Sequence, residues 1–321
     1  MPAQQVRTLA AWAAGLLVAV PLVTAVCRLA GTDGVTPVPQ LLSALPLMAV
    51  PAVLALVLAL VARRRVLAGV TAAVLAVTGW FVLPYGPDGT GAGGPVVARV
   101  RVLAANVEFG QATGRLLAAA RAERAQLVFV TECDPACVRT LAEGLRDRLP
   151  YRVTVPGAGS TGSAILSAYP LVAEAPLPAA MGMPGATARI GGREVRLRLA
   201  HPLPPLPGQV DDWRAELGRV RDWAAGAVAA GPPVLLAGDF NASQDHEAFR
   251  DVLDTGLHDA ARLTGAARTP TWPREGAVPT YTQIDHVLAG ADFTARGTRF
   301  LDLPGSDHRA VLAELDLHAD G

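Results

Sequence analysis

Three long apolar segments occupy the first part of the chain. They run from Leu9 to Val26, from Leu41 to Ala62 and from Val66 to Leu83, and none contains a charged side chain. Each approaches the ~20 apolar residues that a helix needs to cross a bilayer. The pattern predicts a three-helix transmembrane region over residues 1–86. Two alternatives remain, because the first segment could be a cleaved secretory signal and all three could be core helices of a soluble protein.

The placement of arginine predicts how this region is oriented. Arg7 precedes the first apolar segment, and Arg63, Arg64 and Arg65 separate the second from the third. Basic residues favour the cytoplasmic side, so three spans that begin inside leave the chain outside the plasma membrane. Residues 87–98 are rich in Gly and Pro near their start and are interpreted as a linker. Everything after the linker is expected to be extracytoplasmic, on a multi-pass protein with a cytoplasmic N-terminus.

From Arg99 onward, short apolar strands alternate with helical segments, which predicts an α/β or α+β domain over residues 99–321. Helices are expected at 113–124, 135–148 and 210–229. Strands are expected at 99–106, 126–132, 151–155, 163–168, 194–200, 233–238, 283–290 and 292–302, and 306–317 is a further strand candidate.

Polar residues gather at the ends of these predicted strands. They are Asn106, Glu132, His201, the pair Asp239 and Asn241, the pair Asp285 and His286, and the pair Asp307 and His308. Polar residues at strand ends are how a sheet builds a site. Taken singly, several have a structural explanation, since Asp239 or Asn241 could cap a helix that begins near Gln244.

Two of these positions ask for partners. In the stretch GDFN, Asp239 and Asn241 lie two positions apart, so in an extended chain both face one way while Phe240 points into the core. Asp285 lies in an apolar strand, where an unpaired carboxylate costs several kcal/mol, and His308 is an available partner. Glu132 could cap the following helix, although Asp134 is better placed to do so.

Composition adds a constraint on the partner. The chain has no lysine, and residues 99–321 hold 23 arginines against 26 acids, a net charge of −3, whereas residues 1–98 carry +3. A mildly acidic domain is a poor electrostatic partner for a long polyanion, so nucleic acid is less favoured than a small phosphorylated ligand or a lipid.

The motifs GDFN (238–241), IDH (284–286) and SDHR (306–309), preceded by Asn106 and Glu132, resemble the endonuclease/exonuclease/phosphatase superfamily. The resemblance spans about residues 99–318 in the order that the family has. It implies a four-layer α/β sandwich, in which two mixed β-sheets pack face to face with helices outside. It also implies metal-dependent hydrolysis of a phosphate ester.

The resemblance assigns a role to each position. At the metal, Glu132 resembles the carboxylate that binds the ion, Asn106 resembles its neighbour, and Asp307 matches an aspartate near the ion. Asp239 resembles the group that activates water, and Asn241 resembles the amide that holds a phosphoryl oxygen. His308 resembles the histidine on the scissile phosphate, Asp285 its orienting carboxylate, and His201 a second histidine. Oxygen ligands suit Mg²⁺, with Mn²⁺ as an alternative, and a hard cation neutralises the anionic ester during attack by water.

The leading expectation is therefore an extracytoplasmic, membrane-anchored, Mg²⁺-dependent phosphoesterase. Its substrate would be a phosphate ester or pyrophosphate, such as that of a lipid carrier of the cell envelope. The anchor-plus-domain plan resembles that of VanJ-type teicoplanin-resistance membrane proteins, which adds a role in antibiotic resistance by analogy. A surface nuclease acting on extracellular DNA and a non-catalytic module that binds a phosphorylated ligand are the alternatives. Cys133 and Cys137 either form a disulfide or stay free.

Overall fold

The computed structural model describes residues 3–83, 93–274 and 279–319. The chain divides into two compact units, of which one comprises Met1–Pro84 with Asp245–Glu247 and the other comprises Tyr85–Gln244 with Ala248–Gly321.

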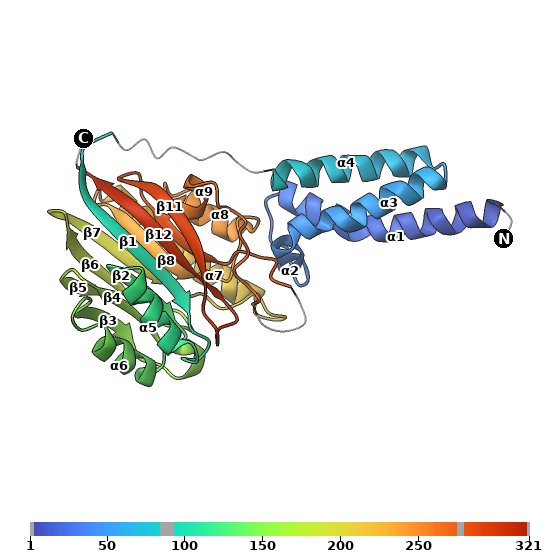
Figure 1. Cartoon of the computed structure of the whole chain (residues 1–321). Coiled ribbons are helices and arrows are strands. Elements are labelled where there is room, and N and C mark those ends of the chain that lie inside the picture. Colours follow the sequence, from blue (N-terminus) through green and yellow to red (C-terminus); the bar gives the residue numbers. More distant parts are fainter. Residues whose placement is uncertain (1–2, 84–92, 275–278, 320–321) are drawn as a thin grey trace. The chain divides into compact units, whose positions relative to one another are not determined.

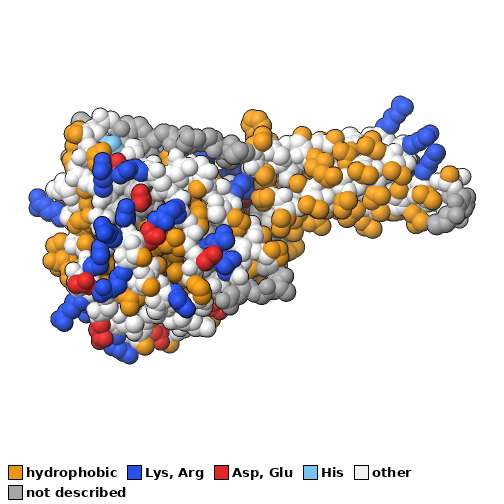
Figure 2. Space-filling view, in the orientation of Figure 1, with side chains coloured by type: hydrophobic (Ala, Val, Ile, Leu, Met, Phe, Trp, Pro, Cys, Tyr) orange, Lys and Arg blue, Asp and Glu red, His pale blue; other side chains and the backbone are white. Residues whose placement is uncertain are grey.

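The N-terminal unit is helical, and hydrophobic side chains cover the outside of its long helices (Figure 2). Its elements are α1 (Ala3–Leu29), α2 (Val38–Ser43), a 3₁₀ helix (Leu45–Met48), α3 (Ala49–Val61) and α4 (Arg65–Val82). Helices α1 and α4 are long and apolar enough to cross a membrane, with mean hydropathies of 2.2 and 1.7. The second expected span is divided, and its apolar helical part, Leu45–Val61, is shorter than those two helices.

The C-terminal unit contains two six-stranded mixed sheets (Figure 1). The first sheet has the order β11 (Phe293–Asp302), β12 (Arg309–His318), β1 (Val96–Asn106), β2 (Leu127–Thr131), β4 (Ser163–Ser167), β3 (Tyr151–Val155). The second has the order β5 (Leu171–Glu174), β6 (Gly185–Ile190), β7 (Arg193–Ala200), β8 (Val234–Asp239), β10 (Asp285–Ala289), β9 (His258–Asp259). Its helices are α5 (Thr113–Ala122), α6 (Pro135–Gly144), α7 (Val210–Ala229), α8 (Glu247–Leu253) and α9 (Ala260–Leu263).

Side-chain alternation explains the layers. Along β1, Val100, Val102 and Ala104 face inward and join a buried cluster formed by both sheets. Leu103 and Ala105 face outward, where α5 and α6 cover them. The outer face of the second sheet packs on α7 and α8. The result is helix, sheet, sheet, helix, so the fold class expected from the motifs is confirmed.

Three sequence-based expectations differ from the structure. Strand β1 begins at Val96, inside the linker expected over residues 87–98, and residues 87–92 of that linker lie outside the described part of the chain. The hairpin β5–β6 was not predicted, because GATARI in β6 has few of the β-branched and aromatic residues that mark strands. Helix α6 ends at Gly144 rather than at residue 148. Glycine is a poor helix former, and the apolar Leu145 and Leu149 that follow pack into the outer cluster from irregular chain.

Candidate active site

The topology brings strand ends from both sheets to one edge. In the first sheet, β1 and β2 are parallel, with Asn106 opposite Thr131, so Glu132 emerges one residue beyond Asn106's level. Strand β12 is antiparallel to β1, and its start at Arg309 lies at the same edge. Parallel strands share their carboxyl ends and an antiparallel neighbour begins there, which explains why residues far apart in sequence converge.

The second sheet repeats this arrangement. Strands β7 and β8 are parallel, with Ala200 opposite Gly238, so His201 and Asp239 leave the sheet together. Strand β10 is antiparallel to β8 and sets Asp285 directly opposite Asp239. The two sheets face each other, so each contributes one set of polar side chains to the same edge of the sandwich.

Glu132 and Asn106 lie in contact at the centre of this edge. The Asn106 amide donates to Glu132 Oε1 at 3.0 Å and to Asp239 Oδ2 at 3.1 Å, thereby linking the two sheets. The Asn106 oxygen accepts the Glu108 N–H at 2.9 Å, so the amide nitrogen rather than the oxygen faces the carboxylates. Phe109 N–H donates to Glu132 Oε2 at 3.2 Å. Glu132 also has a φ of 56°, a left-handed conformation that is uncommon for a non-glycine residue.

Asp239 and Asn241 are held together by a turn rather than by strand alternation. Strand β8 ends at Asp239, and Asn241 has a φ of 46°, so the extended geometry expected for GDFN does not continue to Asn241. Instead, the Asn241 N–H donates to Asp239 Oδ1 at 2.8 Å. The Asn241 amide donates to the Pro202 carbonyl at 3.0 Å, and Phe240 is buried in the core as expected. Two left-handed residues at one site are strain of the kind that clusters at functional positions.

Asp285 and His308 form the expected pair. Asp285 Oδ2 accepts from His308 Nδ1 at 2.9 Å, and both side chains are buried. His308 Nε2 is then directed at Asp239 Oδ2, 3.7 Å away. Burial opposes a positive charge here, but Asp285, Asp239 and the hydrogen bond to Asp285 outweigh it and raise the pKa of His308 to about 10. His308 is therefore an imidazolium at neutral pH, able to donate to an anion.

His201 is buried, and neither of its ring nitrogens has a hydrogen-bond partner among the described residues. Its Nε2 lies 4.0 Å from both Glu132 Oε1 and Asp239 Oδ2. Burial lowers the pKa of His201 to about 4, so the ring is neutral. An unpartnered, buried polar group that faces two carboxylates indicates that the site is built for something that the protein itself does not supply.

Asp307 lies at the rim, with its Oδ1 3.7 Å from His308 Nε2. Its other oxygen accepts from Trp272 Nε1 at 2.9 Å. Ser306 supports the same turn, because its hydroxyl donates to the Asn106 carbonyl and accepts the His308 N–H. Sequence reasoning missed Trp272 and the hydroxyl role of Ser306. Only the motif SDHR pointed to Ser306, and no pattern singled out Trp272.

His286, the neighbour of Asp285, points to the other face of β10 and away from this cluster. Its Nδ1 pairs with Asp259 Oδ2 at 2.8 Å, and its Nε2 contacts the Ala242 carbonyl at 3.0 Å. Strand alternation separates the two members of the predicted strand-end pair, so only Asp285 joins the cluster.

The donor set fits a hard divalent cation. Burial raises the pKa of the Glu132 carboxyl, and the charge of Asp239 raises it further, although the Asn106 hydrogen bond acts in the opposite direction. Burial likewise raises the pKa of Asp239, against the lowering effect of His308. Carboxylates that are costly to ionise together gain most from a cation between them.

A second arrangement of possible ligands exists among the described residues. Ligand atoms of Asp239, Asp285 and His308 lie within 4.8 Å of one another. His308 Nδ1, however, is already hydrogen-bonded to Asp285 Oδ2 at 2.9 Å, and the raised pKa of His308 favours the imidazolium, which has no lone pair for a metal. The sequence placed the cation at Glu132 with Asn106 beside it. Because the Asn106 oxygen accepts the Glu108 N–H and its amide nitrogen faces the carboxylates, Glu132 remains the candidate ligand and Asp239 takes the place of Asn106 as the second candidate.

The segment after Glu132 is fixed by two features. Asp134 caps α6 by accepting the Cys137 N–H at 2.8 Å, so Glu132 is free of that task. Cys133 and Cys137 form a disulfide across this cap. Of the alternatives left open by the sequence, the structure has the bonded one, directly beside the candidate metal ligand.

Comparison with known proteins agrees with this geometry. A model of the "Endonuclease/Exonuclease/phosphatase family" matches residues 103–308. No curated protein matches the chain. Among solved structures, an endonuclease/exonuclease/phosphatase from Beutenbergia cavernae is similar with a TM-score of 0.57 and 23% identity, over 69% of this chain and 72% of that one.

Two further structures share the fold at lower identity. One from Bacteroides vulgatus, also described as an endonuclease/exonuclease/phosphatase, and D. rerio TDP2 in complex with a single-strand DNA product each have a TM-score of 0.56 and 14% identity. Each comparison covers 68% of this chain and 99% of the other. The family match covers well over half of the sequence and includes every candidate site residue. The chain belongs to the endonuclease/exonuclease/phosphatase family, whose members are generally hydrolases of phosphoester bonds.

Proposed function

We propose that the chain is a membrane-anchored, Mg²⁺-dependent phosphoesterase with its catalytic domain, residues 99–321, outside the plasma membrane. The observation that supports catalysis best is the convergence of Glu132, Asp239 and His308, which come from three separate strand ends. The Asn106 amide connects the first two, and His308 Nε2 lies 3.7 Å from the second. A module that only binds phosphate has no need of a buried carboxylate aimed at an imidazolium.

The residues divide the chemistry among them. Mg²⁺ at Glu132 would neutralise charge on the ester and on the leaving oxygen. Asp239, whose raised pKa makes it a better base than an ordinary carboxylate, orients and deprotonates the attacking water. His308 donates from Nε2 to a phosphoryl oxygen, and Asp285 holds its ring in place. Asn241 has a second amide N–H for the same oxyanion, and neutral His201 accepts or donates at the opposite wall. Asp307 is proposed to orient His308 from the rim.

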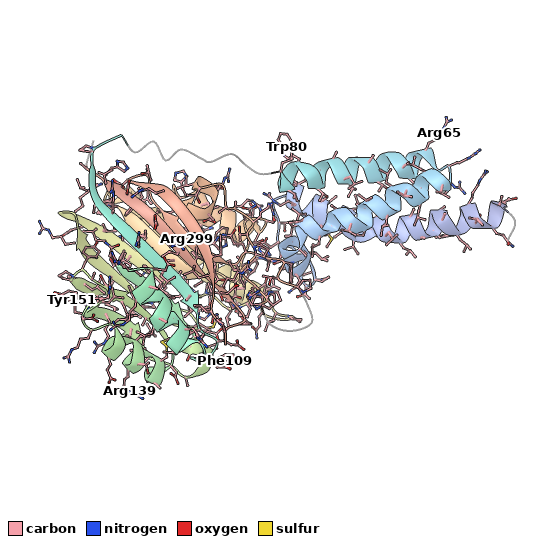
Figure 3. All side chains as sticks on the ribbon, in the orientation of Figure 1. Arg65, Trp80, Phe109, Arg139, Tyr151 and Arg299 are labelled. Carbon is pink, nitrogen blue, oxygen red and sulfur yellow. A yellow bond between two sulfur atoms is a disulfide. The ribbon has the colours of Figure 1, made fainter. Side chains whose placement is uncertain are left out.

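The helical unit supports the proposed anchor. Thr8 and Trp12 line one groove with Arg63, Arg64 and Arg65, so the N-terminal end of α1 and the basic turn before α4 lie at the same end of the bundle (Figure 3). Three passes with that end in the cytoplasm would leave the domain outside. The Cys133–Cys137 disulfide fits the same side, because disulfides persist in oxidising compartments.

Cysteine labelling in cells tests this topology. In a Cys27→Ser background, the exposed α6 position Thr140→Cys is expected to react with a membrane-impermeant maleimide in intact cells, whereas Arg64→Cys reacts only after permeabilisation. Cys133 and Cys137 are disulfide-bonded and stay silent without reductant. The reverse pattern, which two spans would produce, would place the domain in the cytoplasm and contradict the proposal.

We further propose a phosphate or pyrophosphate on an envelope lipid carrier as the substrate. A tethered domain meets lipid head groups far more often than free solutes, since tethering gives a high effective concentration. Phe109 has 54% of its surface exposed, on the loop whose N–H binds Glu132, and offers an apolar contact at the rim of the site. The plan is that of VanJ-type teicoplanin-resistance proteins, which makes glycopeptide resistance the first phenotype to test.

A surface nuclease is the second candidate. It is favoured by one observation, the shared fold with D. rerio TDP2, which was solved with a single-strand DNA product. The two candidates separate in one experiment. Full-length protein in detergent with Mg²⁺ is offered a polyprenyl diphosphate in one tube and plasmid and single-strand DNA in another. We expect the lipid to release phosphate and the DNA to stay intact, and EDTA should stop the release of phosphate. Rapid DNA cleavage without lipid turnover would make the nuclease the function.

A further inference from the structure

One face of the C-terminal unit carries a concentration of arginine that the catalytic site does not use. Figure 2 shows blue side chains spread over this face. Two grooves lie on it, of about 410 Å³ and 490 Å³. The first is lined by Arg99, Arg101, Arg124, Arg148 and Arg296 with Glu314 and Asp316, and the second by Arg139, Arg146 and Arg152 with Glu143. We call these eleven charged residues the basic face.

The basic face opposes the net charge of the domain. Its eight arginines and three acids give +5, whereas the rest of residues 99–321 holds 15 arginines and 23 acids, a charge of −8. Neighbouring ion pairs such as Arg121–Asp147 and Arg299–Glu123 are neutral and leave this difference unchanged. The domain is therefore polarised, and an anionic partner would meet this face first.

The sheet pattern shows how the face arises. Outward positions on β1 read Arg99, Arg101, Leu103 and Ala105, so the strand changes from charged to apolar where α5 and α6 begin to cover it. On the neighbouring β12, Asp316 and Glu314 stand opposite Arg99 and Arg101. An outer sheet face that has no helix over it, at the first strand after the linker, is free to meet another surface.

Pairing on this face is incomplete. Arg99 contacts Asp316 at 3.6 Å and Arg101 contacts Glu314 at 3.2 Å, which uses both acids of the first groove. Arg124, Arg148 and Arg296 have no acidic partner within the described part of the chain, and all three are exposed. Exposed guanidinium groups that share a groove without counter-charges are arranged to receive an anion, most directly a phosphate.

We propose that the basic face docks the domain on the anionic phospholipid surface of the membrane to which the N-terminal helices anchor it. Thirteen residues, 83–95, separate α4 from β1. At about 3.3–3.6 Å per residue they reach roughly 45 Å at most, so β1 and its arginines cannot leave the neighbourhood of the bilayer.

This proposal rests on the anchoring proposed above, and reconstitution tests the two separately. Full-length chain carrying Cys27→Ser and Thr140→Cys is labelled with a donor dye and placed in nanodiscs with an acceptor on the lipid head groups. The discs contain phosphatidylcholine alone or with phosphatidylglycerol. We expect higher energy transfer in the anionic discs and loss of the increase in high salt. Failure to enter discs would contradict anchoring, whereas entry with equal transfer in both lipids overturns docking.

The decisive variant is the triple substitution Arg124→Gln, Arg148→Gln and Arg296→Gln. At about 1 kcal/mol for each arginine near an anionic surface, it should weaken docking by on the order of 100-fold. The matched control replaces Arg189, Arg219 and Arg221, which are exposed outside the basic face, with Gln. It should retain the increase in energy transfer in the anionic discs. Equal loss in both variants would mean general charge attraction and overturn the proposal. Single-strand DNA that binds chains in neutral discs, and is released by the first variant alone, would assign the face to nucleic acid instead.

Discussion

Replacing Asp239 with Asn should reduce turnover by about 10²–10⁴-fold, the range for loss of a general base. Asp239 is 2% exposed and contacts polar groups of both sheets. Its Oδ2 accepts from Asn106 and faces His201 and His308. Asparagine keeps the size of the side chain but cannot take a proton. Its NH₂ group can also face the NH₂ group of Asn106, which in the wild type donates to Asp239 Oδ2. Phosphate release from the lipid substrate at saturating Mg²⁺ measures the effect.

The same substitution at a surface position provides the control. Asp211 on α7 is 94% exposed at its side chain, so Asp211→Asn should retain wild-type turnover. Phe240 and Phe249 pack beside this turn, with their ring centroids 5.3 Å apart, so their near-ultraviolet circular dichroism depends on the turn being folded. The spectrum of Asp239→Asn should therefore match that of the wild type. An Asp239→Asn protein that hydrolyses at the wild-type rate would remove Asp239 from the mechanism.

Much of the fold was accessible from local patterns. Helix α7 was predicted with its exact bounds, because seven of its buried positions recur at helical spacing on one face. Strand β3 was also placed correctly. The short elements β9 and α9 were missed, since a two-residue strand and a four-residue helix carry too little periodicity to detect. Helix α8, considered only as a helix that begins near Gln244, begins at Glu247 and has seven residues. Their existence depends on tertiary contacts.

The candidate site was accessible for a different reason. Charged residues at the ends of apolar strands are costly unless they have partners, so Asp285 predicted His308 across 22 intervening residues, and the structure pairs them at 2.9 Å. What the sequence could not supply was orientation. Glu132 and Asn241 adopt positive φ, and the Asn106 amide turns its nitrogen inward. These orientations depend on how the two sheets pack against each other, which the sequence of one strand does not predict.

The net charge of the domain was a poor guide to the surface that a partner meets. A net charge of −3 for residues 99–321 was read as unfavourable for nucleic acid. The fold sorts that charge into a basic face of +5 and a remainder of −8, so the net value does not describe what an approaching anion meets. The preference for a lipid substrate therefore depends on the proposed anchor and its orientation.

Replacing Asp285 with Asn should lower turnover by about 10²–10⁴-fold at alkaline pH and by less at acidic pH. Asp285 provides a charge and a hydrogen bond that, together with the charges of Asp239 and Asp307, raise the pKa of His308 to about 10. With Asn the pKa of His308 falls, because burial still disfavours the imidazolium. In the wild type, donation from His308 persists until the pH approaches that raised pKa. In the variant, it is lost as pH rises through the lowered value, so activity should begin to fall at a lower pH than in the wild type.

The pH profile distinguishes this role from simple damage to the fold. A variant that is merely misfolded loses activity at every pH, whereas loss of the imidazolium is partly reversed by acid. His308→Gln removes the titrating group. Its residual activity should therefore lack the fall with rising pH that Asp285→Asn introduces. If the pair acts as one unit, the double variant should be no slower than His308→Gln alone. Additive losses in the double variant, or parallel pH profiles for Asp285→Asn and the wild type, would show that Asp285 acts on something other than the charge of His308.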